Sequence, residues 1–182
     1  MQEPYFWYVM YVKSNTEKRV AEDIVRSELA GGYELEPFCP EAEFYYGKNA
    51  ERKDVYRKRL LFPAYVFIET NMPEKEFARA FSSYIYNSQD IIRLLRYGKT
   101  DRIALPLEER QRLEFLLKGK RCLDRSVGVI EGDRIVISCG PLVGMEGMIK
   151  HINRHSRTAT IKTELLGSTV EVKVALEIVS KK

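Results

Sequence analysis

Both histidines of the chain, His151 and His155, lie in one short stretch together with three charged side chains, Lys150, Arg154 and Arg157. Two histidines four residues apart share one face of a helical turn and could there bind a metal ion together. However, no carboxylate or thiolate stands beside them in the sequence, and three positive charges oppose a cation. We therefore expect no metal site, and an anion is the better match for these residues.

The positive charge of the chain is concentrated rather than large. The net charge is +4 at neutral pH, and residues 1–118 contain as many acidic as basic residues. Residues 150–157 contain three basic residues and no acidic one. A local excess of this kind is typical of contact with a polyanion. The alternative is a solvated loop that is basic by chance.

No sequence pattern indicates an enzyme. The chain lacks a glycine-rich phosphate loop, a dinucleotide-binding fingerprint, an HExxH zinc motif and a GxSxG nucleophile motif. Glu108 and Glu109 are flanked by Arg110 and Arg112, which is typical of a solvated helix face. We expect no catalytic residues and no cofactor.

The cysteines indicate a reducing compartment. Cys39, Cys122 and Cys139 are odd in number and widely spaced, with no CxxC pair. This favours free thiols over disulfides or a zinc site. No apolar run approaches the ~20 residues that span a membrane. We expect a cytoplasmic monomer.

The first 118 residues predict strands alternating with helices. Aromatic and β-branched runs indicate strands, and apolar residues at helical spacing indicate helices. The expected strands are residues 6–12, 34–47, 54–61, 62–69 and 90–98, of which 34–47 and 54–61 form a hairpin with a basic tip. The expected helices are residues 14–29, 72–84 and 105–118. This order predicts an α+β fold with an antiparallel sheet flanked by helices.

Two of these helices carry finer signals. Ser14 and Glu17 have the spacing of a capping box at the start of the first helix. In the last helix, four leucines are expected to face inward: Leu107, Leu113, Leu116 and Leu117.

The remainder of the chain predicts a small all-β barrel. Residues 119–127 are short and polar, as expected for a linker. From residue 128 to residue 182, short strand-like runs are separated by turn residues, and no helix of any length is indicated. We therefore expect domains at 1–118 and 128–182, joined by the linker 119–127.

The strand expected at residues 62–69 is apolar on both faces. Alternation places four residues on one face, namely Phe62, Ala64, Val66 and Ile68. It places Pro63, Tyr65, Phe67 and Glu69 on the other face. One explanation is a central strand buried on both sides. The other is an exposed aromatic patch, which is typical of a protein interface.

Three motifs together resemble the NusG family of transcription elongation factors. They are the aromatic strand at Trp7-Tyr8, the Phe62-Pro63-x-Tyr65 motif, and the stretch GDRIVISCGPLVGMEG from Gly132 to Gly147, which is similar to a KOW motif. The resemblance covers Trp7 to about Val179. It implies an N-terminal domain that docks on the clamp helices of the largest RNA polymerase subunit, and a C-terminal SH3-like barrel.

By this resemblance, six residues are the implied polymerase contacts: Tyr11, Phe62, Pro63, Tyr65, Phe67 and Arg96. In relatives, a further segment contacts the displaced non-template DNA strand. Its counterpart lies near Arg79, Ser82 and Ser83, where the motif is not closely preserved.

The basic turn resembles the specialised LoaP-type antiterminators, whose barrel binds a structured hairpin in the nascent RNA. General elongation factors of the family tend to carry an acidic or mixed turn there. The expected RNA-binding residues are Lys150, His151, Asn153, Arg154, His155, Ser156, Arg157 and Lys162. If residues 151–156 form a helical turn, then Lys150, Arg154 and Arg157 share one face. The implied function is processive transcription antitermination, without enzymatic activity.

The alternative is a general elongation or pausing factor whose barrel binds a ribosomal or termination protein. The contact would then be the apolar loop Pro141–Val143, with Leu142 at its centre. A freestanding RNA-binding module is a third, weaker possibility, because the first domain resembles a polymerase-binding one.

Overall fold

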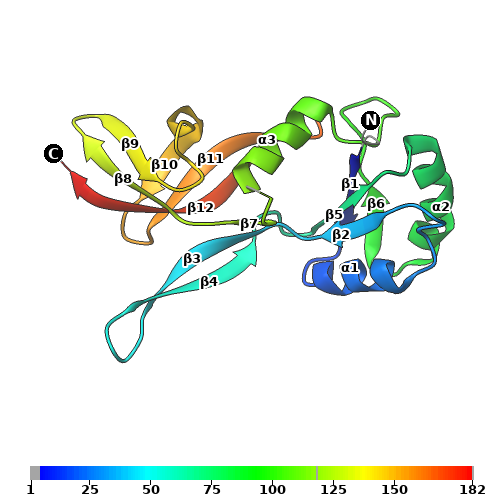
Figure 1. Ribbon diagram of the computed structural model, residues 1–182, viewed down its shortest axis with the longest axis horizontal. Helices are drawn as coiled ribbons and strands as arrows, with labels where there is room; N and C mark the ends of the chain where they lie inside the picture. Colours follow the sequence, from blue (N-terminus) through cyan, green and yellow to red (C-terminus); the bar gives the residue numbers. More distant parts are fainter. Residues whose placement is uncertain (1–4, 118, 182) are drawn as a thin grey trace. The chain divides into compact units, whose positions relative to one another are not determined.

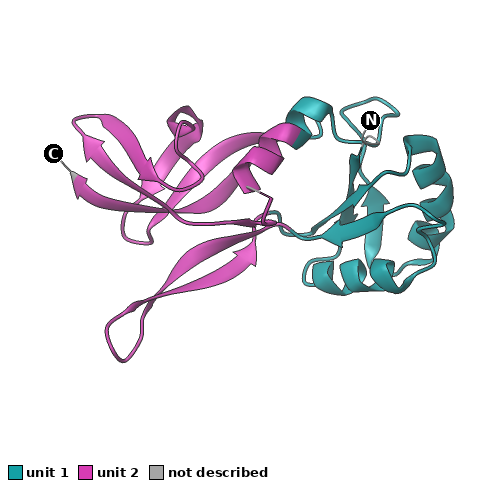
Figure 2. Cartoon of the chain, in the orientation of Figure 1, with its two compact units in different colours: residues 1–39, 62–110, 165–168 teal, residues 40–61, 111–164, 169–182 magenta. Residues whose placement is uncertain are grey.

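The computed structural model describes residues 5–117 and 119–181 (Figure 1). The chain forms two compact units (Figure 2). Unit 1 comprises residues 1–39, 62–110 and 165–168, and unit 2 comprises residues 40–61, 111–164 and 169–182. The predicted linker at residues 119–127 does not separate these two units, because the hairpin at residues 40–61 groups with the C-terminal strands. The division into folding domains stays a prediction.

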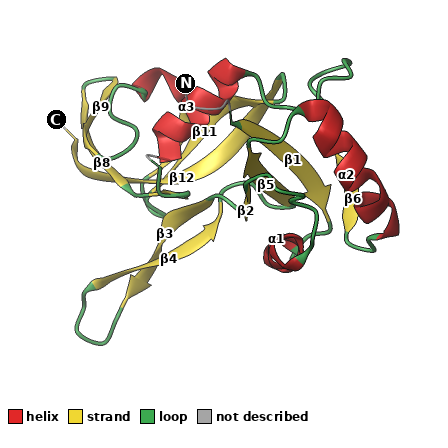
Figure 3. Ribbon diagram, turned by 45° about the vertical axis from the view of Figure 1, so that its right-hand side comes forward, coloured by secondary structure: helices red, strands yellow, loops and turns green. Residues whose placement is uncertain are grey.

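Unit 1 contains a four-stranded antiparallel sheet in the order β2-β5-β1-β6. Its strands are β1 (Phe6–Val12), β2 (Leu35–Phe38), β5 (Tyr65–Thr70) and β6 (Ile91–Leu94). Helices α1 (Glu17–Arg26) and α2 (Glu74–Asn87) lie beside this sheet (Figure 3). Alternate residues of β1, namely Tyr8, Met10 and Val12, join the buried side chains of the helices in one core. Unit 1 therefore contains an antiparallel sheet flanked by helices, as predicted. The predicted strand at residues 34–47 is divided, and its second part pairs with residues 54–60 in a separate sheet.

The first helix begins differently from the capping-box prediction. Thr16 and not Ser14 precedes α1, and the Thr16 hydroxyl donates to the carbonyl of Lys13 instead of capping the helix. Glu17 is only 3% exposed. Its carboxylate turns inward and accepts the backbone N–H of Ala64 at 2.7 Å. The capping box predicts that Glu17 bonds to Ser14 at the start of its own helix, whereas its hydrogen-bond partner Ala64 lies 47 residues away.

The strand predicted from residue 62 begins only at Tyr65, because residues 62–65 form a tight turn. The N–H of Tyr65 donates to the carbonyl of Phe62 at 3.3 Å, with Pro63 second in the turn. Ala64 follows with a φ of 67°, as the third position of a type II turn requires. The carbonyl of Ala64 accepts the N–H of Val12 at 2.9 Å, which joins the turn to the end of β1.

Unit 2 consists mainly of strands. A three-stranded sheet in the order β4-β3-β7 contains β3 (Glu41–Lys48), β4 (Asp54–Leu60) and β7 (Cys122–Leu123). A five-stranded sheet in the order β10-β11-β12-β8-β9 contains β8 (Ser126–Glu131), β9 (Arg134–Cys139), β10 (Ile149–Asn153), β11 (Thr158–Leu165) and β12 (Ser168–Lys181). A short 3-10 helix, η1 (Glu146–Met148), precedes β10. The C-terminal region is therefore built of strands, and closure into an SH3-like barrel stays a prediction.

The predicted linker is partly structured. Within residues 119–127, β7 pairs in parallel with the start of β3, and β8 begins at Ser126. The chain around Cys122 thus completes the sheet of the β3–β4 hairpin.

The last helix, α3 (Leu107–Leu117), departs from its predicted inward face. Leu107 is 55% exposed, whereas Leu113, Leu116 and Leu117 are buried as expected. The inward position of the first turn is occupied by Glu109, which was expected to be solvated. Its carboxylate accepts the backbone N–H groups of Leu166 at 2.7 Å and Gly167 at 3.0 Å. Two amide donors offset the burial of this charge.

The carboxylate of Glu17 anchors the turn at residues 62–65, and its removal tests this role. We expect Glu17→Ala to lower the free energy of unfolding by about 1–3 kcal/mol, because the buried N–H of Ala64 is left unsatisfied. Urea denaturation followed by the fluorescence of Trp7, the single tryptophan and fully buried in β1, measures this loss. The control is Glu22→Ala in the same helix, where the exposed carboxylate pairs with Arg26. Equal losses in both variants would contradict the anchoring role.

Candidate functional site

The basic stretch forms a β-hairpin and not a helical turn. Strands β10 and β11 pair antiparallel, with Asn153 opposite Thr158, and residues 154–157 turn between them. The side chain of Asn153 accepts the N–H of Ser156 at 3.0 Å, which stabilises the turn. The predicted sharing of one helical face by Lys150, Arg154 and Arg157 is therefore wrong. Alternation along a strand replaces the helical spacing.

The hairpin presents most of the predicted RNA-binding residues to solvent. Lys150, His151, Arg154 and His155 are exposed, as are Asn153 and Ser156. Within residues 5–117 and 119–181, no carboxylate pairs with Lys150 or Arg154. These two cations are thus available to an external anion.

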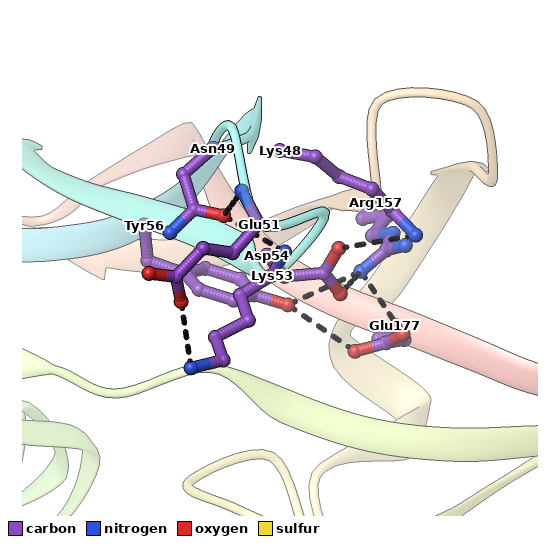
Figure 4. A network of polar contacts seen from close by, with 8 residues as sticks. All are labelled: Lys48, Asn49, Glu51, Lys53, Asp54, Tyr56, Arg157 and Glu177. Carbon is purple, nitrogen blue, oxygen red and sulfur yellow. Dashed lines mark hydrogen bonds and ion pairs between the residues drawn. The ribbon is translucent and has the colours of Figure 1, made fainter.

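Arg157 is placed differently from its neighbours (Figure 4). Its guanidinium donates to the carboxylate of Asp54 at 2.5 Å and pairs with that of Glu177 at 3.1 Å. The same group bonds the hydroxyl of Tyr56 at 3.3 Å and lies 4.1 Å from the ring centroid of Tyr45. Arg157 therefore joins the β3–β4 hairpin to the turn between β10 and β11 and to β12.

The backbone of Arg157 is constrained as well. Its φ of 51° lies in the left-handed region, and its carbonyl accepts the N–H of Leu176 at 3.0 Å. The hydrogen bond from Arg157 lowers the pKa of the Asp54 carboxyl, and the nearby charges of Arg157, Lys48 and Arg125 act in the same direction. In return, Asp54 raises the pKa of Arg157. The charge of Arg157 is thus largely neutralised inside unit 2.

Lys162 also has an acidic neighbour. It lies on β11, and its ammonium is 3.9 Å from the carboxylate of Glu171 while remaining exposed. Lys150, Arg154 and the two histidines are therefore exposed, whereas Arg157 and Lys162 have acidic partners.

The predicted polymerase contacts divide into exposed and buried residues. Tyr11 and Tyr65 stand opposite each other on β1 and β5, are half-buried, and have ring centroids 5.6 Å apart. Pro63 is exposed in the preceding turn. By contrast, Phe62 and Phe67 are 4% and 0% exposed. The explanation of a buried central strand holds for Phe67, since β5 lies between β2 and β1.

The buried rings pack with one another. Phe67 lies 5.6 Å from Phe62, 5.5 Å from Phe38 and 6.2 Å from Trp7, measured between ring centroids. Such aromatic pairs stabilise the sheet beyond their buried area. Phe62 and Phe67 thus belong to the interior of unit 1, whereas Tyr11 and Tyr65 are half-buried.

One residue beside the tyrosines had no signal in the sequence. The guanidinium of Arg93 on β6 lies 5.9 Å from the ring centroid of Tyr11, which is its neighbour across the sheet. The pairing of β1 with β6 brings them together, and local sequence does not encode that pairing. Arg96 is exposed and pairs with Asp101 at 2.8 Å. On α2, Arg79, Ser82 and Ser83 are exposed.

The loop expected to bind a protein partner also differs from the sequence prediction. Leu142 is 1% exposed and packs inside unit 2, whereas Val143 is 48% exposed. Val143 is therefore the apolar side chain that this loop offers to a partner.

The described residues, 5–117 and 119–181, contain neither a metal-ligand cluster nor a membrane-spanning helix. Within this part of the chain, no group of three or more His, Cys, Asp or Glu side chains could hold a metal ion. None of its helices combines the length and the apolar character needed to cross a membrane. Cys39, Cys122 and Cys139 form no disulfide with one another, and burial raises the pKa of Cys122.

Comparisons with known proteins agree on one family. The family model "Transcription termination factor nusG" matches residues 5–115. The transcription termination/antitermination protein NusG of Borreliella burgdorferi is 25% identical over 182 residues, covering 96% of this chain and 97% of that protein. The protein of the same name from Thermus thermophilus is 23% identical over 180 residues, with the same coverage.

A solved structure shares the fold. It is described as "Domain interaction in Thermotoga maritima NusG" and has a TM-score of 0.51 at 18% identity. The match covers 96% of this chain and 94% of the other.

The lowered pKa of Asp54 predicts a pH-dependent contribution to stability. The ionised carboxylate stabilises the fold above its unfolded-state pKa of about 3.9, and this contribution is lost as the pH falls through the lower folded-state pKa. We therefore expect Asp54→Asn to be less stable than the wild type at neutral pH, with a difference that shrinks below about pH 4. Thermal unfolding followed by circular dichroism at several pH values measures it.

The matched control is Asp133→Asn, an exposed aspartate on the turn between β8 and β9. It should change stability little at any of these pH values. A pH-independent loss in Asp54→Asn would contradict a charge-based contact with Arg157.

Proposed function

The chain belongs to the NusG family of transcription termination/antitermination factors, and we propose that it acts as a processive antitermination factor of the LoaP type. Unit 1 binds RNA polymerase at the clamp helices of its largest subunit. The hairpin of β10 and β11 binds a structured RNA element in the nascent transcript. Two simultaneous contacts raise the effective concentration of the factor at the polymerase and select the transcripts it serves.

The observation that carries this proposal is the absence of acidic residues around the exposed turn of the β10–β11 hairpin. Residues 147–163 contain no aspartate or glutamate, and Lys150 and Arg154 have no carboxylate partner in the described parts of the chain. Such cations bind phosphates and release counterions. His151 and His155 are exposed and can stack on unpaired bases or add charge when protonated.

The polymerase contact rests on the half-buried pair Tyr11 and Tyr65 and on the exposed Pro63. Tyrosine and arginine are enriched among the residues that dominate interface energies. Arg93, stacked near Tyr11, adds a cation at the edge of this apolar surface. The non-template DNA strand is a further candidate partner near Arg79, Ser82 and Ser83 on α2, where the family motif is not closely preserved.

The second candidate is a general elongation factor whose C-terminal strands bind a protein. The half-exposed Val143 is the apolar side chain through which the loop at residues 141–143 would make this contact. In this case the basic hairpin is incidental.

Replacing Arg154 separates the two candidates. We expect Arg154→Ala to weaken binding to structured leader RNAs from the same genome by about tenfold. We also expect the slope of log binding constant against log salt concentration to become shallower by about one unit, because one phosphate contact is lost. Gel-shift titrations of the full chain at several salt concentrations measure both quantities.

The control variant is Lys75→Ala, which removes one exposed positive charge from α2 in unit 1. It should leave RNA affinity nearly unchanged. RNA affinity that survives Arg154→Ala would favour the general elongation factor and its contact at Val143.

The polymerase surface is tested with Tyr65→Ala. We expect this variant to weaken binding to RNA polymerase by about tenfold or more, because a central aromatic anchor is removed. Tyr86→Ala is the control, since Tyr86 on α2 is 90% exposed and lies outside the proposed surface. Biolayer interferometry with purified polymerase compares them, and the same affinity for both variants would refute the assignment.

A further inference from the structure

The β3–β4 hairpin has two chemically different faces, set by its register. Residues directly opposite each other in an antiparallel pair share a face. We call the first face the inner face; its residue pairs are Glu41–Leu60, Glu43–Lys58, Tyr45–Tyr56 and Lys48–Asp54. We call the second face the outer face; its residue pairs are Ala42–Arg59, Phe44–Arg57 and Gly47–Val55.

The inner face is engaged within unit 2. Arg157 lies over Tyr45 at 4.1 Å and Arg125 lies over Tyr56 at 4.4 Å, measured to the ring centroids. Asp54 on this face binds Arg157. The three carboxylates of the two strands, Glu41, Glu43 and Asp54, all belong to the inner face. The outer face therefore has no acidic residue.

The outer face carries a ladder of arginines and aromatic rings. The guanidinium of Arg57 lies 3.6 Å from the ring centroid of Tyr46, and that of Arg59 lies 5.7 Å from the ring centroid of Phe44. Tyr46 stands at the register shift between Tyr45 and Gly47 and is 54% exposed. Within the described parts of the chain, no carboxylate pairs with Arg57 or Arg59.

This combination suits an unpaired nucleic acid strand. A stacked guanidinium keeps its in-plane N–H groups free for phosphate oxygens. Exposed rings offer platforms on which bases stack, and basic groups track the backbone. A merely solvated ribbon would be expected to mix both charges on each face, as the inner face does.

We propose that the outer face of the β3–β4 hairpin binds single-stranded RNA next to the structured element held by the β10–β11 hairpin. The inference rests on the proposed RNA-binding function. RNA is assigned because both hairpins belong to unit 2 and are joined through Asp54 and Arg157 (Figure 4). The outer face is turned away from Arg157, so a strand leaving the structured element reaches it around the edge of the β3–β4 hairpin. Arg57, Arg59 and Tyr46 are its main contacts.

The test uses the full chain and two kinds of probe. The first is a labelled uridine oligomer of about 12 nucleotides, within the usual site sizes for single strands, with its thymidine counterpart. The second is the leader stem-loop RNA bound by the wild type, with and without a single-stranded flank. Fluorescence anisotropy gives each affinity for the wild type, Arg57→Gln and Lys58→Gln. Lys58 is the matched control, because it is the next residue on β4 but lies on the inner face.

We expect Arg57→Gln to weaken oligomer binding by about tenfold and to abolish the affinity gained from the flank, while Lys58→Gln changes both little. Tyr46→Leu should also reduce the gain, which separates stacking from charge. Circular dichroism of each variant checks that the fold is intact.

Three outcomes would overturn the proposal. The first is oligomer binding that Arg57→Gln does not change. The second is that Arg57→Gln loses affinity for the thymidine oligomer but keeps the affinity that the wild type gains from the single-stranded RNA flank. This result would assign the surface to DNA. The third is lost polymerase binding with unchanged RNA binding, which would assign it to a protein. If the proposed function is wrong, Arg154→Ala instead keeps wild-type affinity for the stem-loop RNA without its flank. The two failures are therefore distinguishable.

Discussion

One guanidinium, that of Arg157, connects three segments that are far apart in the sequence. Arg157 lies in the turn between β10 and β11, and its guanidinium binds Asp54 of β4 and Glu177 of β12. A left-handed backbone and two flanking carboxylates fix it in place. This contact joins both basic hairpins of unit 2. An arginine suits the position because its planar fork bonds several acceptors while stacking on Tyr45.

The contact also determines which positive charges are free. Arg154 and Arg157 lie in the same four-residue turn, yet one is exposed and the other is neutralised. A similar division holds on β4, where Asp54 faces inward and Arg57 faces outward. Net charge alone does not describe such a surface. What a polyanion meets is the set of cations that the fold leaves without carboxylates.

Local patterns in the sequence were sufficient for most elements and insufficient for their contacts. The aromatic run of β1 and the helical spacing in α1 and α2 predict those elements correctly. Glu17 and Glu109 were misjudged because their backbone partners lie 47 and 57 residues away. Arg157 was grouped with Arg154 by sequence proximity, although its partner Asp54 is 103 residues distant. Burial of Phe62 and Phe67 likewise depends on neighbours that no local pattern identifies.

The register shift at Tyr46 has a consequence for how this hairpin can evolve. Tyr45 pairs with Tyr56 and Gly47 pairs with Val55, so the ladder passes over Tyr46. Loss of this one residue would leave the pairing on both sides, and therefore the inner-face position of Asp54, unchanged. Insertion or deletion of this one residue can thus add or remove an aromatic side chain without changing the register of the strands. Chain length at this position can vary between homologous proteins while the contact with Arg157 is kept.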